Sequence, residues 1–131
     1  SWRVVGANAV AALVEVLAHA VADCFGCHSV IDWTRMPPRL TPGTIGRGGE
    51  RWDPETADMP GVVYSPNLTP AHLGEWTDGE IFRAVTTGIS RDGHMLFPLM
   101  PYYAFGKIDE EDVKSIIAYI RSVQQEKGFE Q

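Results

Sequence analysis

The stretch that decides the fold is Cys24-Phe25-Gly26-Cys27-His28, which has the pattern C-x-x-C-H. Two thiols at this spacing can add to the two vinyl groups of haem, and this addition gives two thioether bonds. The histidine that follows is then carried beneath the iron as an axial ligand. The spacing matters because both sulfurs and the imidazole must reach one porphyrin from one face. The motif therefore predicts one covalently bound haem c attached through Cys24 and Cys27, with His28 as a metal ligand.

Three other uses of a C-x-x-C pair fit this chain less well. A dithiol redox motif normally lies in a βαβ unit, and no such pattern is present. A zinc site needs four ligands at tetrahedral spacing, and the other histidines of the chain form no second paired pattern. A structural disulfide at this spacing would close a tiny loop and would gain little in entropy. Both cysteines of the chain lie in this one motif, so haem attachment remains the prediction.

The second axial ligand is predicted to be Met100, in the stretch Phe97-Pro98-Leu99-Met100-Pro101-Tyr102. Two prolines stiffen the backbone on either side, so the thioether is presented at low entropic cost. Filling the core is the commoner fate of a methionine, and the neighbouring His94 and Met95 are the alternative ligands. We expect aromatic and aliphatic side chains to line the haem pocket. They are Phe25, Phe82, Leu96, Phe97, Leu99 and Tyr102, with Pro98 beside them.

Three segments predict helices, and a long segment between them does not. Residues 7–23 are rich in alanine, valine and leucine. Residues 77–87 start with a T-x-x-E capping box and end at Gly88. Residues 109–125 have an acidic first turn and an apolar face with a helical period. Residues 29–70 hold seven of the nine prolines and five glycines, which predicts a long loop insertion. We therefore expect an all-α fold.

Length and charge narrow the class of protein further. The chain has 131 residues and is expected to form a single domain over residues 1–131. Its formal net charge is −6, which argues against nucleic acid as a partner because phosphate binding needs a basic patch. The apolar run from Val4 to Ala22 is interrupted by Asn8, Glu15 and His19, so it predicts an amphipathic helix rather than a membrane span. The chain starts at Ser1, and we expect any export signal to have been removed.

These residues resemble a known group of proteins. The chain looks like a monohaem class I c-type cytochrome, and its second half is similar to the haem modules of the cytochrome subunits of bacterial alcohol and related dehydrogenases. The matching stretches are Ala22 to His28, Ser65-Pro66-Asn67-Leu68-Thr69-Pro70, Gly74-Glu75-Trp76-Thr77, Asp92 to Tyr102 and Ile116 to Ser122. The resemblance implies the cytochrome c fold, with few helices around one haem. It also implies Met100 as the distal ligand, Tyr119 packed on the first helix and Trp76 beside a haem propionate, although ordinary core packing explains Trp76 equally well. Those subunits usually carry three C-x-x-C-H motifs, whereas this chain carries one.

The leading functional prediction is one-electron transfer by an iron that protein ligands close on both sides. The chain would be a free relay between a redox donor and an acceptor, or a small subunit of a larger complex such as a dehydrogenase or an oxidase. In the second case the loop over residues 29–66 would be the contact surface, and any membrane association would come through a partner. The alternative role of this loop is to cover one edge of the haem. The alternative is catalysis or small-ligand binding at an open iron site, with His94 as the nearest acid or base. Thioether attachment of this kind takes place outside the bacterial cytoplasm, so the resemblance implies the periplasm or the periplasmic face of the inner membrane.

Overall fold

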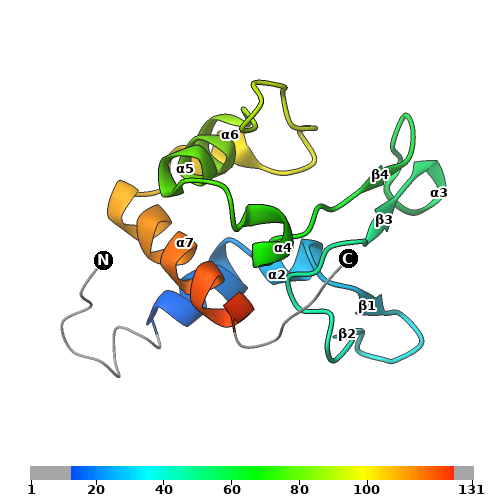
Figure 1. Cartoon of the computed structure of the whole chain (residues 1–131). Coiled ribbons are helices and arrows are strands. Elements are labelled where there is room, and N and C mark those ends of the chain that lie inside the picture. The colour runs from blue at the N-terminus through cyan, green and yellow to red at the C-terminus, as the bar shows by residue number, and fades with distance from the viewer. Residues whose placement is uncertain (1–12, 126–131) are drawn as a thin grey trace.

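The computed structural model describes residues 13–125 of the chain (Figure 1). Its helices are η1 (Leu17–Val21, a π-helical turn), α2 (Cys24–Cys27), α3 (Pro54–Ala57), α4 (Pro70–Leu73), α5 (Asp78–Thr87), α6 (Tyr102–Phe105) and α7 (Glu110–Gln125). Its strands are β1 (Ile31–Asp32), β2 (Arg39–Leu40), β3 (Arg51–Trp52) and β4 (Val63–Tyr64). The longest helices of the described part are α7 and α5, and the other named helices have four or five residues each.

The helix predicted over residues 7–23 is confirmed in part. Residues 13–16 are α-helical, and the chain then widens into the π-helical turn η1. The helix ends at Val21, because Asp23 takes a left-handed conformation with φ of 50°. Residues 7–12 of the prediction lie outside the described part. Among the described residues, no helix has the length and apolar character needed to cross a membrane.

The helices predicted over residues 77–87 and 109–125 are both confirmed, with the expected caps. The Thr77 hydroxyl accepts from the Glu80 amide at 3.1 Å, and the Glu80 carboxylate accepts from the Thr77 amide at 3.0 Å. This reciprocal pair starts α5. Gly88 ends α5 in the left-handed region with φ of 73°. The Asp109 carboxylate accepts from the Glu111 amide at 2.9 Å and so caps α7.

The core consists of two apolar clusters that meet along α7. The first joins η1, α2 and α7, and its buried members are Ala18, Phe25, Ile116 and Ile120. The second joins α4, α5 and α7, and its buried members are Leu73, Ile81, Val113 and Ile117. The apolar face predicted for the last helix is therefore buried at Val113, Ile116, Ile117 and Ile120. Val123, which the same helical period assigns to this face, has a side chain outside the described part. The expected contact of Tyr119 with the first helix is confirmed, since a hydrogen bond of 3.1 Å joins its hydroxyl to His19 Nε2.

The long loop over residues 29–70 contains some regular structure that its composition did not predict. Strands β1 and β2 pair antiparallel, and so do β3 and β4. The single-turn helices α3 and α4 lie in the same segment or at its end, and each has a proline in its first turn. Figure 1 shows both small sheets on the side of the molecule away from α5 and α7. The strands have two residues each, which is too short for alternation in the sequence to be visible. The all-α cytochrome c fold stays a prediction.

Candidate functional site

The structure holds Cys24, Cys27 and His28 on one turn of helix. The His28 amide donates to the Cys24 carbonyl at 2.9 Å, which closes the turn. Both cysteines are free thiols, Cys24 half-buried and Cys27 exposed. Burial raises the pKa of the Cys24 thiol to about 12, and burial together with the nearby Asp23 carboxylate raises the pKa of Cys27. Both groups are therefore neutral thiols at physiological pH, which does not suit a thiolate redox centre.

The His28 side chain is fixed in the tautomer that a metal requires. It is 9% exposed, and its Nδ1 lies 2.8 Å from the Pro66 carbonyl oxygen. A carbonyl only accepts, so Nδ1 carries the proton and Nε2 is the nitrogen left to bind a metal. Burial lowers the pKa of His28, although the bond to Pro66 acts in the opposite direction. The imidazole is therefore neutral, which is the form that binds metals.

The long loop supplies the support for this histidine by folding back over the motif. Gly48 donates to the His28 carbonyl at 2.8 Å, and Leu68 donates to the Gly46 carbonyl at 2.7 Å. Gly48 has φ of 76°, and a Cβ there would lie 2.5 Å from the Pro66 carbonyl carbon. Only glycine allows this close approach. The sequence did not predict the roles of Gly48 and Pro66. Glycines are frequent throughout the loop, and no side-chain pattern indicates which backbone carbonyl will accept a hydrogen bond.

Met100 comes from a separate part of the molecule, between α5 and α6. Its side chain is half-buried, and its amide donates to the Phe97 carbonyl at 3.2 Å. Phe97 is 42% exposed, and Pro98 is exposed too. Tyr102 is half-buried against α5, where a Cβ on Gly88 would lie 2.6 Å from its ring. The predicted haem contacts of Phe97, Pro98 and Tyr102 stay predictions.

The remaining candidates occupy different surroundings. Trp76 is half-buried and packs against the cluster of α4, α5 and α7, with its ring 5.7 Å from that of His72. Packing in the core therefore buries part of the Trp76 side chain, and its contact with a haem propionate stays a prediction. His94 lies in an exposed turn, where its ring is paired with Asp92 and its amide donates to the same carboxylate at 3.1 Å. Met95, the other alternative ligand, is 72% exposed.

The residues present fit the haem that the sequence predicts. The donor set is one neutral histidine with Nε2 available, beside two neutral thiols. Phe97 and Leu99 are large apolar side chains that stand 42% and 40% exposed, as expected of side chains that a flat apolar group would cover. Asn67, 2% exposed and next to Pro66, has a buried Nδ2 for which the described residues provide no acceptor. Its Oδ1 already accepts from the Thr69 amide at 2.6 Å, so Nδ2 is a donor suited to a polar group from outside the protein. Within the described part, no cluster of three or more His, Cys, Asp and Glu residues could hold a metal ion.

Comparison with known proteins gives relatives over most of the chain. No protein-family model matches it. It is 35% identical over 104 residues to the fructose dehydrogenase cytochrome subunit of Gluconobacter japonicus, an alignment that covers 76% of this chain and 18% of that protein. It is 31% identical over 113 residues to the gluconate 2-dehydrogenase cytochrome c subunit of Pantoea cypripedii, covering 80% of this chain and 21% of the relative. It is 32% identical over 117 residues to the cytochrome c subunit of the quinone-dependent alcohol dehydrogenase of Gluconacetobacter polyoxogenes, covering 86% and 22%.

The chain is therefore related to cytochrome subunits of dehydrogenases. It spans about a fifth of the length of these relatives. The relationship agrees with the expected resemblance to such subunits.

Proposed function

We propose, from this relationship and from the geometry around His28, that the chain is a one-electron carrier with a single covalent haem c. Cys24 and Cys27 would attach the haem, and His28 and Met100 would be its axial ligands. The bound haem would supply an iron that alternates between Fe(III) and Fe(II). The observation that carries the proposal is the buried, neutral His28, held by the Pro66 carbonyl beside two neutral thiols.

The protein's own residues would set the chemistry of that iron in three ways. The Pro66 carbonyl orients the His28 ring and makes Nε2 a better donor. The strap of residues 46–49 and 65–68 shields this side of the site from water, and a low dielectric changes the relative stability of the two iron charge states. Met100 would hold the iron as a second protein ligand, and its thioether would favour the reduced iron and leave no open position for a substrate.

The partner is proposed from the relatives, and the location from the predicted haem attachment. Those proteins are cytochrome subunits of fructose, gluconate and alcohol dehydrogenases. We therefore infer that this chain accepts electrons from a dehydrogenase within a complex and passes them to a second redox protein. We also propose that the chain lies in the periplasm or on the periplasmic face of the inner membrane, because thioether attachment of this type takes place outside the bacterial cytoplasm. The cytochrome c fold, with short helices around one haem, is part of the same proposal.

An absorption spectrum of the haem-loaded protein tests the ligand set. Oxidised protein with a methionine ligand has a weak band at about 695 nm. Met100→Ala should abolish the band, and Met95→Ala, the matched control five residues away in the same loop, should keep it. Mass spectrometry of the denatured protein should find one haem bound, and none in the Cys24→Ala, Cys27→Ala double variant. Rapid binding of carbon monoxide by the reduced, unaltered protein would contradict the closed site and would favour small-ligand chemistry instead.

A further inference from the structure

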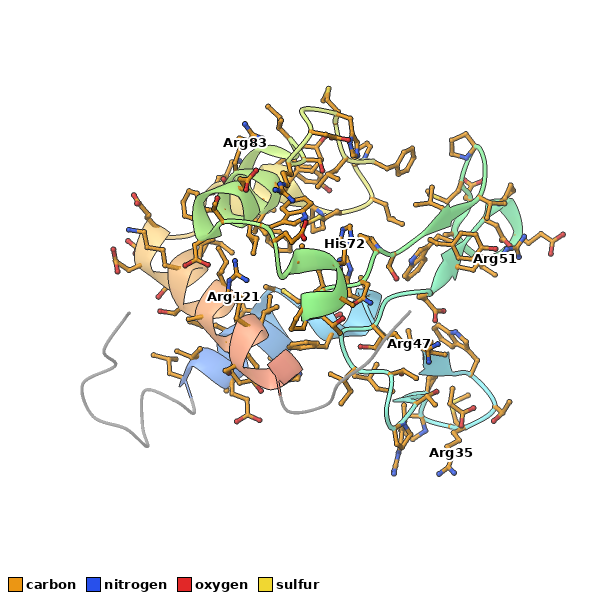
Figure 2. The ribbon with its side chains drawn as sticks, in the orientation of Figure 1. Arg35, Arg47, Arg51, His72, Arg83 and Arg121 are labelled. Carbon is orange, nitrogen blue, oxygen red and sulfur yellow. The ribbon has the colours of Figure 1, made fainter. Side chains whose placement is uncertain are left out.

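We propose that Arg83 is a positioning residue for Met100, because it fixes the loop that presents the methionine thioether. The proposal rests on the proposed function, since it takes Met100 as the second iron ligand. Arg83 lies on α5 (Figure 2), and its Nη2 donates to the Ser90 carbonyl at 2.8 Å and, more weakly, to the Arg91 carbonyl at 3.4 Å. One guanidinium thus bridges two consecutive carbonyls at the tip of the loop.

The loop that Arg83 contacts is a compact unit that folds back on the end of α5. The Leu96 amide donates to the Gly88 carbonyl at 2.7 Å, and the Ser90 amide donates to the His94 carbonyl at 2.9 Å. A single antiparallel bridge joins Ile89 and Met95 between these two bonds. Ser90 is 5% exposed, so the carbonyl that Arg83 contacts belongs to the most buried residue of the turn. Arg83 is the side chain of α5 that bonds to the backbone of this unit.

The far end of the Met100 segment is anchored on the same helix. Tyr102, at the start of α6, packs on Gly88 so closely that a Cβ there would lie 2.6 Å from its ring. A Cβ on Gly106 would lie 2.6 Å from the Thr86 carbonyl oxygen, so the end of α6 also approaches α5 closely. Both ends of the segment are therefore fixed to α5, one through residues 88–96 and the other through α6.

The segment between these anchors has little support of its own. Phe97, Pro98 and Leu99 are exposed, and the Met100 amide bonds only locally, to the Phe97 carbonyl. The position of the thioether is therefore set by the two anchors, and loosening one of them should let the methionine leave the iron more often. The α6 anchor is steric and apolar. The Arg83 anchor is a charge-assisted hydrogen bond, which a single substitution can remove without opening a cavity in the core.

Nearby ion pairs do not replace this anchor. Arg91 Nε lies 3.4 Å from a Glu80 carboxylate oxygen, and its Nη1 lies 3.8 Å from Glu75, whose side chain is 91% exposed. These contacts reach the loop through an exposed side chain and are weakened by salt. Arg83 contacts the backbone itself. Both bonds come from one nitrogen, Nη2, of a planar and rigid guanidinium, whereas a lysine ammonium on a flexible stem loses more side-chain freedom for each bond that it forms.

The test uses haem-loaded, oxidised protein and added imidazole, which competes with a methionine ligand for the iron. Arg83→Gln should bind imidazole about tenfold more tightly than the unaltered protein, the size expected for one hydrogen bond to a charged group. Arg83→Lys should fall between the two. Arg35→Gln is the matched control, because Arg35 lies in the turn between β1 and β2 and forms its ion pair with Asp32 of β1. This variant should leave imidazole binding unchanged. The band at about 695 nm should weaken in Arg83→Gln at a temperature below the unfolding midpoint.

Each outcome separates this proposal from the proposed function. If the unaltered protein has the band but Arg83→Gln and Arg83→Lys bind imidazole as it does, Arg83 has no positioning role and only this inference fails. If the unaltered protein lacks the band and binds imidazole as tightly as Met100→Ala, Met100 is not a ligand and both proposals fail. If Arg83→Gln does not fold, Arg83→Lys decides, because imidazole binding equal to that of the unaltered protein overturns the bridging role.

Discussion

Replacing Phe25 by alanine should lower the free energy of unfolding by about 4 kcal/mol. Phe25 lies between the two cysteines of the motif, yet it is 1% exposed. Its ring centroid is 4.7 Å from that of His19 and 6.2 Å from that of Tyr119, the latter at an edge-on angle of 80°. The side chain therefore joins η1 to α7, and the variant removes a ring from the centre of the first core cluster.

The magnitude follows from this burial. Truncating a fully buried phenylalanine costs roughly 3–5 kcal/mol, and an edge-on aromatic contact carries roughly 0.5–1.5 kcal/mol beyond area burial. Phe25→Leu keeps most of the volume and should cost less than about 1.5 kcal/mol. Because neither variant touches a thiol or His28, the amount of covalently bound haem should not change.

Urea unfolding of the haem-loaded protein, followed by far-ultraviolet circular dichroism, measures both losses. Tyr64→Ala is the control, since Tyr64 is an aromatic side chain 59% exposed on β4, and it should cost less than about 1 kcal/mol. A loss below about 1 kcal/mol for Phe25→Ala would refute the packing argument. A loss of haem attachment with unchanged stability would show instead that Phe25 serves the haem and not the helix contact.

Two further substitutions test other parts of the structure. Arg121→Ala should lower the free energy of unfolding by about 2 kcal/mol, because Arg121 Nη2 donates to the Trp76 carbonyl at 2.6 Å and ties α7 to the start of α5. Most of that loss of stability should persist at high salt, because salt screens a bond to a neutral carbonyl less than it screens an exposed ion pair. If the loss vanishes at high salt, the exposed ion pair of Arg121 with Asp78 accounts for it instead. Asp53→Asn should lower the melting temperature most near neutral pH. Bonds from the backbone and side chain of Thr56 hold the pKa of Asp53 below its usual 3.8, so its stabilisation is present above that value and is lost as the pH falls through the lower folded pKa. A melting-temperature difference that stays constant from neutral to acid pH would contradict the role of its charge.

Local signals were enough to predict the two long helices. The capping box of Thr77 and Glu80, the left-handed Gly88 and the Asp109 cap all act within a few residues of the helix ends. The buried face of α7 follows from a period of 3.6 residues, which is also local. Such features depend little on the rest of the chain, so their positions in the sequence agree with the structure to within a residue or so.

Local sequence patterns predict less about the long loop over residues 29–70. Its prolines and glycines predict a segment without long helices, but they do not specify that β1 pairs with β2 and β3 with β4. The sequence also predicts Phe25 among the aromatic and aliphatic side chains of the haem pocket, and that contact stays a prediction. The structure packs its ring against His19 and Tyr119, and the second of these lies on α7, far along the chain. Which side of a short helix faces the core depends on what packs there, and α2 has only a single turn.

The sequence by itself led to the proposed haem chemistry, because Cys24, Cys27 and His28 are close neighbours along the chain and the covalent backbone sets their spacing. Only the tertiary structure decided how the side chains proposed for it are positioned. The His28 tautomer depends on Pro66, 38 residues away, and the segment of Met100 depends on both ends being fixed to α5. Both arrangements use backbone carbonyls as acceptors, and every residue type has one, so the pattern of side chains does not indicate which carbonyl is used before the chain has folded.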